Sequence, residues 1–302
     1  MRSRSASPPR VVFLISGYRS STQATINTVI STLLEHPPAA IAEGSVRSAD
    51  GTRIGFFRLG EGPAVIFVHG SISTHTDWMP VAKLLSRSFN CFVIDRRGRG
   101  RSGPGNFPYS IVRECEDIAA VASAAGPGAA LVGHSYGAIC TFEAALRIPV
   151  RRMVVYEPPF PVGGPVAGQY LAPYAAAIER GDLDAALEIG FTRFTQFSTS
   201  AIVRMRSSRA WPRQRVLAPT WTRELQVMDS ISPDIERYCS LACPIMLLAG
   251  SESPEHPMKD SVHALTQAIP GIRVETLVGH AHVGLRTAPT LVAPLIGHFL
   301  SA

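Results

Sequence analysis

The architecture of this chain is set by Leu131-Val132-Gly133-His134-Ser135-Tyr136-Gly137-Ala138, in which an apolar run ends in Gly-x-Ser-x-Gly and leads into a helix-forming segment. Residues 130–132 are predicted to form a buried strand, and residues 139–147 a helix that stops before Pro149. A sharp strand-to-helix turn holds a serine hydroxyl clear of the backbone, where a neighbouring base can activate it. We therefore predict that Ser135 is a nucleophile and that the backbone N–H of Tyr136 faces a developing oxyanion.

Strands and helices alternate on both sides of this turn. Apolar or alternating runs predict strands at 45–47, 53–59, 64–68, 91–94, 244–250 and 272–278. Amphipathic periodicity predicts helices at 74–87, 111–125 and 289–300. The first two strands flank a segment of turn residues at 48–52 and should form an antiparallel hairpin. The strict alternation that follows predicts an α/β fold with a parallel sheet and right-handed crossovers.

The length and the net charge of the chain limit its domain organisation and its possible ligands. It has 302 residues with 46% hydrophobic content, enough for one large core, and a formal net charge of +6. Seven arginines and no acidic residue lie between residues 193 and 223, which equals or exceeds the whole surplus of positive charge. Two interpretations are open for this run: attraction of an anionic substrate or surface, or a solvated helical face.

The cysteines predict neither a disulfide framework nor a metal site. Their number is odd and they are scattered through apolar segments, at positions 91, 115, 140, 239 and 243. Cys239 and Cys243 have no second Cys or His pair at zinc-finger spacing. We expect no metal and no cofactor.

Residues 1–43 are predicted to be a separate, weakly ordered N-terminal extension. The apolar run at 11–15 follows a basic, Ser/Pro-rich start but is interrupted by Gly17, so a signal peptide is the less favoured interpretation. Apolar residues between Ile26 and Leu34 share one helical face, and Pro37-Pro38 ends that helix. No stretch has the apolar length of a membrane span. We expect a cytoplasmic protein that binds no nucleic acid.

Five motifs at predicted strand ends resemble those of α/β-hydrolase-fold enzymes of the esterase, lactonase and cofactor-free haloperoxidase type. They are His69-Gly70, Asp95-x-Arg97-Gly98-x-Gly100-x-Ser102, the turn at Ser135, Tyr156-Glu157-Pro158-Pro159, and Gly279-His280-Ala281-His282. The resemblance covers about residues 45–302. It implies a hydrolase domain at 44–302, built on a mostly parallel eight-stranded sheet flanked by helices. A helical lid is expected at about 160–240, after the sixth strand.

The same resemblance implies an oxyanion hole and a substrate pocket. The backbone N–H of Ser71 would be the second donor of that hole, beside the N–H of Tyr136. His69, Gly70, Trp78 and His134 would lie around the substrate, with Trp78 near the acyl group. We expect His134 to pack or to donate a hydrogen bond rather than to act as a second base.

His282 is the predicted general base. An imidazole is suited to this role because its pKa lies near neutrality, so it can take the proton of a serine and return it to a leaving group. In the family that this chain resembles, a glycine stands three residues before the histidine, and here that spacing joins Gly279 to His282. His280, in the same loop, is the alternative.

The acid that should orient the histidine is where the chain departs from the family's commoner pattern. The usual position, after the seventh strand, is occupied by Ser253, and no aspartate lies between Pro244 and Met258. Some branches of the family carry the acid after the sixth strand, which makes Glu157 the best candidate. Three alternatives remain open: Glu252, Glu255, and no acid at all.

Together these residues predict a serine hydrolase that cleaves a carboxylic ester or lactone. Aromatic and aliphatic residues in the inserted segment favour a small-molecule substrate with an apolar acyl group. Perhydrolase, haloperoxidase, carbon–carbon hydrolase or lyase chemistry on the same triad is the alternative. A catalytically inactive ligand-binding relative is less favoured, because it would need neither Ser135 nor His282.

Overall fold

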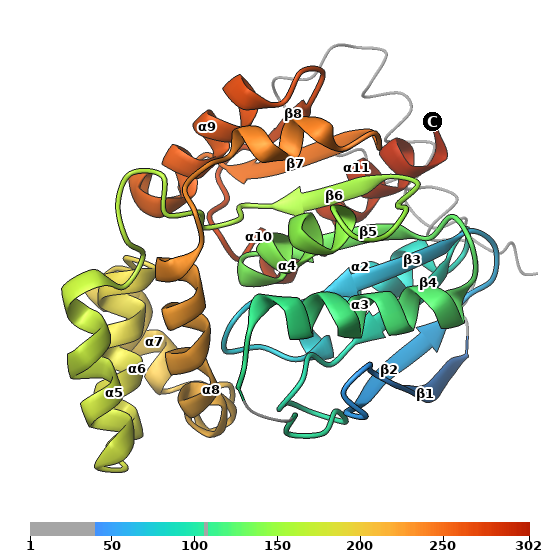
Figure 1. The fold of residues 1–302 in the computed structure, drawn as a ribbon. Coiled ribbons are helices and arrows are strands. Elements are labelled where there is room, and N and C mark those ends of the chain that lie inside the picture. The colour runs from blue at the N-terminus through green and yellow to red at the C-terminus, as the bar shows by residue number, and fades with distance from the viewer. Residues whose placement is uncertain (1–39, 106–107) are drawn as a thin grey trace, which may run out of the picture. The chain divides into compact units, whose positions relative to one another are not determined.

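One eight-stranded sheet forms the centre of the molecule (Figure 1). The computed structural model describes residues 40–105 and 108–302, so the helix expected between Ile26 and Leu34 lies outside the described residues. The strand order is β1-β2-β4-β3-β5-β6-β7-β8, antiparallel between β1, β2 and β4 and parallel from β4 onward. The strands are β1 Ile41–Arg47, β2 Arg53–Leu59, β3 Ala64–Val68, β4 Asn90–Ile94, β5 Ala130–His134, β6 Met153–Tyr156, β7 Ile245–Gly250 and β8 Arg273–Leu277. The mostly parallel sheet expected from the sequence is confirmed.

Burial follows the position of each strand in the sheet. All five residues of β3 and of β5 are buried, as expected for central parallel strands covered on both faces. Strand β8, at the edge, alternates between more and less exposed residues. Strand β1 begins at Ile41, earlier than expected, because Ile41 pairs with Leu59 at the far end of β2. The domain boundary expected at residue 44 therefore lies inside β1.

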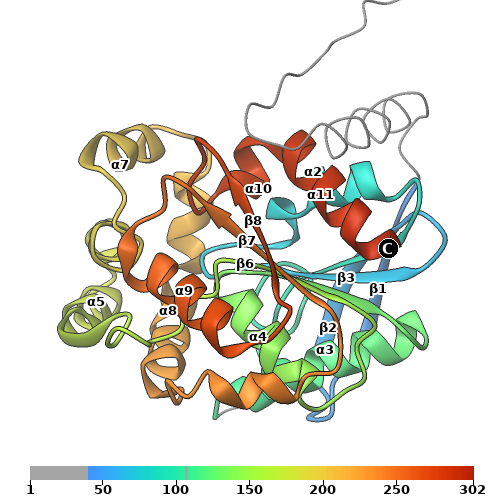
Figure 2. The ribbon, with the colours of Figure 1, turned by 90° about the horizontal axis from the view of Figure 1, so that it is seen from above.

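Helices cover both faces of the sheet (Figure 2). One face carries α3 Ile111–Ala125, α4 Tyr136–Ala145 and α9 Asp260–Ala268; the other carries α2 Met79–Leu85, α10 Gly284–Thr287 and α11 Pro289–Ser301. The helix expected at 74–87 is instead a 3-10 turn, His75–Asp77, followed by α2. Pro80 explains this division, because proline lacks an N–H and is favoured in the first turn of a helix.

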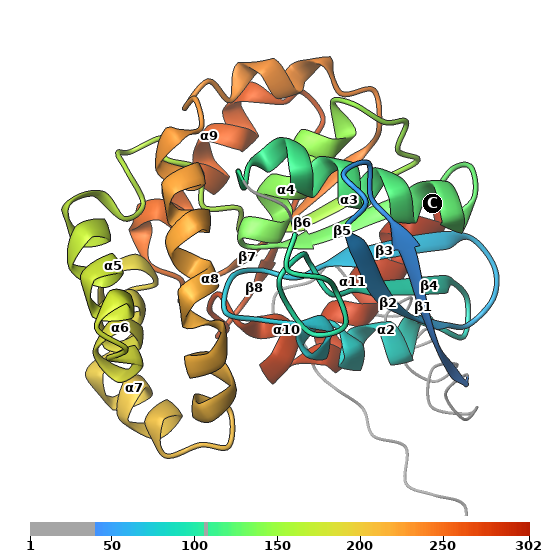
Figure 3. The same cartoon turned by 60° about the horizontal axis from the view of Figure 1, so that its bottom comes forward.

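Four helices are inserted between β6 and β7 and stand together beside the ends of the strands (Figure 3). They are α5 Leu171–Glu179, α6 Leu183–Ile189, α7 Thr199–Arg206 and α8 Trp211–Ser230, with a π-helical turn at Gly190–Phe194. Shorter helical turns lie at Gly168–Tyr170, Glu236–Ser240 and Glu255–Lys259. We call α5 to α8 the inserted helices.

Helix α8 contains two prolines. Proline disfavours a helix interior, yet α8 runs unbroken through Pro212 and Pro219. Pro212 lies in the first turn, where its missing N–H costs nothing. Pro219 removes a hydrogen bond from the helix interior, and burial of Trp221, Leu225 and Met228 on the inner face offsets that loss.

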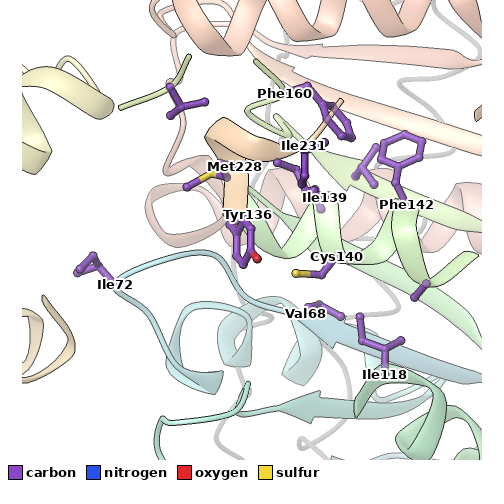
Figure 4. Close-up of a cluster of buried hydrophobic side chains, with 14 of the residues drawn as sticks. Val68, Ile72, Ile118, Tyr136, Ile139, Cys140, Phe142, Phe160, Met228 and Ile231 are labelled. Carbon is purple, nitrogen blue, oxygen red and sulfur yellow. The ribbon is translucent and has the colours of Figure 1, made fainter. Parts of the chain in front are cut away.

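The buried core reaches from the sheet toward these helices (Figure 4). Helix α4 contributes Ile139, Cys140 and Phe142, whose side chains are fully buried. The ring of Phe142 lies 5.7 Å from that of Phe160, just beyond β6. Every residue of α4 from Tyr136 to Ala144 is buried, so packing on all sides fixes the turn that precedes it.

Candidate active site

Ser135 lies at the tip of the turn between β5 and α4. Its backbone has φ 54° and ψ −128°, a conformation rarely adopted outside glycine. A Cβ on Gly137 would lie 2.4 Å from the carbonyl oxygens of Val68 and His69, and one on Gly133 would lie 2.4 Å from Thr141 Oγ1. Only glycine fits at these positions, because the turn packs directly against β3 and against its own helix.

His282 and Glu157 meet across the ends of the parallel strands. Glu157 follows β6 and His282 follows β8; His282 Nδ1 lies 2.8 Å from Glu157 Oε2. The other oxygen, Glu157 Oε1, accepts a hydrogen bond of 2.6 Å from the backbone N–H of Gly250, at the end of β7. His282 is 4% exposed and Glu157 is 1% exposed, so this pair is shielded from water.

The alternative base and acids lie elsewhere. Glu252 is exposed and accepts a hydrogen bond from Ser251 Oγ. Glu255 is 78% exposed and pairs with Lys259 at 2.9 Å. The backbone oxygen of His280 accepts from the N–H of Glu252, and its ring makes no hydrogen bond with any described residue. Of the candidate acids, Glu157 alone reaches His282.

Two backbone N–H groups beside Ser135 have no acceptor in the described part of the chain. They belong to Ser71 and Tyr136. Gly70, which precedes Ser71, packs directly against the nucleophile, because a Cβ on it would be 2.8 Å from Ser135 Cβ. Free N–H groups at the start of a helix attract negative charge, so this arrangement suits an oxyanion.

Strained backbone gathers at the same place. Among the described residues, four non-glycine residues have positive φ: Ile72, Ser135, Glu157 and Gln196. The first two line one cavity, and Gln196 lies between the cavity residues Thr195 and Phe197. Such conformations cost free energy and tend to persist at functional sites.

This cavity has a volume of about 610 Å³ and extends from Ser135 to the inserted helices. Ser71, His134, Ser135 and His282 line its inner end. Most of the remaining wall is apolar and includes Ile72, Val166, Phe191, Phe194, Phe197, Met205, Trp221, Leu225 and Met258. A cavity of this size and composition fits a small molecule with an apolar portion.

The residues expected around the substrate divide into two groups. His134 lines the cavity; its Nε2 lies 2.8 Å from the backbone oxygen of His282, to which it donates. Burial and the adjacent His282 hold the pKa of His134 well below its usual value, so this ring is neutral. His69, Gly70 and Trp78 do not line the cavity, which corrects the expectation.

The reason for this correction is that the side chains of Trp78 and His69 are buried and bonded to backbone groups at the ends of strands. Trp78 is fully buried, and its indole N–H donates to the carbonyl of Val68 at 3.1 Å. His69 is also fully buried, and its Nε2 accepts from the backbone N–H of Arg96 at 3.0 Å. Both residues therefore support the strand ends beneath the cavity instead of contacting its contents.

Sequence reasoning missed a buried ion-pair cluster next to the site. Arg96 donates to Glu114 and to Glu224, at 2.8 Å and 2.5 Å, and these three side chains are at most 1% exposed. Arg99 pairs with the same oxygen of Glu224 at 2.5 Å. Arg96 also donates to the carbonyls of His69 and Gly70. The guanidinium lies 4.6 Å from the ring of Tyr136, so it touches both segments that carry free N–H groups.

The arginine run at 193–223 is neither a uniform solvated face nor a single patch. Arg206 faces Glu188 at 3.8 Å and Arg215 faces Asp184 at 3.4 Å. Arg223 donates to the carbonyl of Arg97, and Arg193 lies over the ring of Tyr170. Arg204 is the member of the run that lines the cavity. The helical spacing of the arginines indicates which of them share a face. It does not show which face lines the cavity until the inner face of α7 is known.

Two further charges line the cavity near His282. Arg286 Nε lies 3.6 Å from Asp77 Oδ1. Burial raises the pKa of Asp77, although Arg286 and Ser73 oppose that shift. Within residues 40–105 and 108–302, no group of acidic, histidine and cysteine side chains is arranged to hold a metal ion. The described helices also include none with the length and apolar character of a membrane span.

Known proteins resemble this chain in sequence over limited regions. N-formylmaleamate deformylase of Pseudomonas putida is 39% identical over 130 residues, which are 41% of this chain and 47% of that protein. Bifunctional epoxide hydrolase 2 of Sus scrofa is 29% identical over 134 residues, 42% of this chain and 24% of that protein. The chain thus matches less than half the length of these curated relatives.

Solved structures match the fold over a larger share. An alpha/beta hydrolase from Sphaerobacter thermophilus has a TM-score of 0.76 and 32% identity, covering 85% of this chain and 100% of that one. An esterase from Rhodococcus has a TM-score of 0.70 and 20% identity, over 86% of this chain and 98% of that one. The model of the alpha/beta hydrolase family matches residues 65–295. With the sheet order and the turn at Ser135, these matches show that the chain belongs to the alpha/beta hydrolase family.

Proposed function

We propose that this chain is a serine hydrolase that cleaves a carboxylic ester or lactone through Ser135, His282 and Glu157. The observation that carries the proposal is the 2.8 Å contact between His282 Nδ1 and Glu157 Oε2, at the end of a cavity that Ser135 also lines. Because Nδ1 faces the carboxylate, Nε2 is the nitrogen left to accept the proton of Ser135.

The proposed reaction has two halves. Ser135 Oγ attacks the carbonyl carbon of the ester as its proton passes to His282 Nε2, and the imidazolium that forms is stabilised by Glu157. The imidazolium then protonates the departing alcohol oxygen. In the second half, His282 takes a proton from water as the water oxygen attacks the acyl carbon. The imidazolium then returns this proton to Ser135 Oγ as the bond between the acyl carbon and Oγ breaks, which releases the carboxylic acid.

The N–H groups of Ser71 and Tyr136 are proposed to hold the negative oxygen in both halves. Both lack acceptors within the described residues, so neither has to break a hydrogen bond to bind an oxyanion. Arg96 supports this geometry by donating to the carbonyls of His69 and Gly70, directly before Ser71.

The inserted helices are proposed to act as a lid, in the place expected at about 160–240. Trp221 of α8 lines the cavity, as do Phe191 and Phe194 of the π-helical turn between α6 and α7. Burying an apolar acyl group against these rings would exclude water from the reacting carbonyl during the first half of the reaction. No cofactor is proposed, because the three side chains and the two N–H groups suffice for acyl transfer.

Hydrolysis of a formyl amide is a second candidate, favoured by the partial match to N-formylmaleamate deformylase. The same residues would serve, with an amine in place of the alcohol as the leaving group. Kinetics with matched formyl amides and esters would separate the two candidates.

Labelling and turnover test the proposal together. A fluorophosphonate should modify the protein at Ser135, as located by peptide mass spectrometry, and Ser135→Ala should not be labelled. The unmodified protein should also hydrolyse p-nitrophenyl alkanoates, with a preferred chain length set by the cavity. If a correctly folded sample shows neither labelling nor hydrolysis, the proposal is wrong.

A further inference from the structure

The inner face of α7 brings one unpaired charge to the cavity. Ala201, Arg204 and Met205 all line the cavity, at the spacing of one helical face. The other charged cavity residues have partners, since Arg286 faces Asp77 and His282 contacts Glu157. Within the described residues Arg204 contacts no carboxylate, although its neighbour Arg206 faces Glu188.

An unpaired amide lies on the next helix. Gln214, in the first turns of α8, lines the same cavity and is 7% exposed. No described residue accepts a hydrogen bond from its amide nitrogen, and its amide oxygen is buried without a donor. A buried amide without partners destabilises a protein. A half-turn about its last side-chain bond exchanges the amide oxygen and nitrogen, so the buried position can present an N–H to an acceptor that enters the cavity.

Two other polar residues of this wall, unlike Gln214, have hydrogen-bond partners. Ser208 Oγ donates to the carbonyl of Met205 at 2.6 Å, and Thr195 Oγ1 donates to the carbonyl of Phe191 at 3.0 Å. Both hydroxyls are therefore satisfied within the inserted segment. Among the charged and amide side chains of this wall, Arg204 and Gln214 have donors that no described residue accepts from. The short link between α7 and α8 joins their helices.

Helix α8 sets the distance between these donors and the reacting end of the cavity. Glu224 bonds Arg96, which itself donates to Gly70 next to Ser135, so this turn of α8 lies level with the nucleophile. Gln214 precedes Glu224 by ten residues, and a rise of about 1.5 Å per residue separates them by about 15 Å along the helix axis. Trp221 and Phe191 line the cavity as well and are apolar.

From this arrangement we infer that Arg204 and Gln214 form a subsite for a carboxylate at the far end of the substrate. The preferred substrates are then esters of dicarboxylic acids in which one carboxyl group is esterified and the other is free. The free carboxylate accepts hydrogen bonds from the guanidinium and the amide nitrogen, while the methylene chain contacts the apolar wall. This inference rests on the proposed esterase function and adds its substrate class.

Kinetics with matched substrates test the inference. The p-nitrophenyl monoesters of dicarboxylic acids with four to twelve carbons are compared with p-nitrophenyl alkanoates of the same length. At the preferred chain length, the ester that ends in a free carboxylate should have a higher kcat/KM than the alkanoate ester of the same length. Arg204→Gln should lower the ratio of the two kcat/KM values about tenfold, the lower end of the range for hydrogen bonds to charged groups. The loss should shrink at high salt.

Arg206→Gln is the matched control, because Arg206 lies on the same helix but pairs with Glu188 outside the cavity. It should leave the ratio as in the unmodified protein. Gln214→Leu should lower the ratio by a smaller factor than Arg204→Gln. An unchanged ratio in Arg204→Gln, or an equal fall in Arg206→Gln, would overturn the subsite.

Binding without turnover separates this inference from the proposed function. Calorimetry with sebacate, a ten-carbon dicarboxylate, should show binding that Arg204→Gln weakens about tenfold and Arg206→Gln does not. If alkanoate esters are hydrolysed and Ser135 is labelled but neither preference nor sebacate binding is found, only the subsite fails. If no ester is hydrolysed and no label is taken up, the proposed function fails, and sebacate binding alone decides the subsite.

Discussion

The two walls of the cavity differ in how their polar groups are satisfied. On the wall made by the strand ends, the catalytic candidates His282 and Glu157 are bonded to each other, and His134 Nε2 donates to the backbone. Within the described residues, Ser71 Oγ and His134 Nδ1 on this wall have no partner. On the wall made by the inserted helices, Arg204 and Gln214 have no partner within the described residues. Paired groups hold their positions before any ligand arrives, whereas unpaired groups gain their hydrogen bonds from the ligand.

This difference separates two roles within one cavity. Changes at the strand ends should act on the rate of the chemical step, because those residues position reacting atoms. Changes on the inserted helices should act on the choice of substrate, because those residues touch it away from the reaction. Glu224 connects the walls, since it belongs to α8 but pairs with Arg96 beside the strand ends.

The largest effect is expected at the reacting atoms. Ser135→Ala and His282→Ala should each lower kcat for the best p-nitrophenyl ester by about 10⁴–10⁶-fold, because each removes a group that makes or breaks a bond. Circular dichroism should show an unchanged fold in both variants. His280→Ala is the control and should lose far less; if its loss is greater than that of His282→Ala, the assignment of the base is wrong.

A somewhat smaller loss is expected at the acid. Glu157→Gln keeps the shape of the side chain but removes the charge that stabilises the imidazolium, so kcat should fall by about 10⁴-fold. Glu252→Gln and Glu255→Gln alter exposed side chains and should have mild effects. A loss at either residue that matches the loss at Glu157 would remove Glu157 from the proposed triad.

The connection between the walls should matter for stability. Glu224→Gln leaves two buried guanidinium groups short of a counter-charge, so the free energy of unfolding should fall by about 3–5 kcal/mol. Glu255→Gln breaks the exposed pair with Lys259 and should cost at most about 1 kcal/mol. Denaturant unfolding measures both, and equal costs would show that the buried cluster contributes no more than a surface pair.

The smallest effect concerns the pH dependence of the strand-end wall. Burial holds the pKa values of His69 and His134 well below 6.5 in the folded protein. Below pH 6.5 the unfolded chain therefore binds protons that the folded protein does not. The free energy of unfolding should then decrease as the pH is lowered. At pH 5.5 the loss should be about 1.4 kcal/mol for each histidine relative to neutral pH.

Urea unfolding at pH 7.5 and pH 5.5 measures this loss, and His134→Gln should reduce it by about one histidine's share. The result reports on the strand-end wall alone, because the inserted helices contribute neither of these two histidines. A loss of the same size in His134→Gln as in the unmodified protein would mean that His134 is not held neutral by the fold.

Local patterns in the sequence were sufficient for much of the architecture. The strand that precedes Ser135, the turn itself and the buried helix after it could all be predicted, because apolar periodicity and glycine spacing act over a few residues. The parallel pairing of the strands could be predicted from their alternation with helices. The sequence could not show that α8 continues through Pro219, since that outcome depends on packing.

The sequence by itself therefore determined that this protein carries a serine at a strand-to-helix turn and a histidine after the last strand. Only the tertiary structure decided which carboxylate meets that histidine, because Glu157 and His282 are 125 residues apart and come together through the side-by-side order of β6, β7 and β8. The same holds for Arg96 and Glu224, which are 128 residues apart. Such pairs depend on how whole elements pack, and no local pattern records that packing.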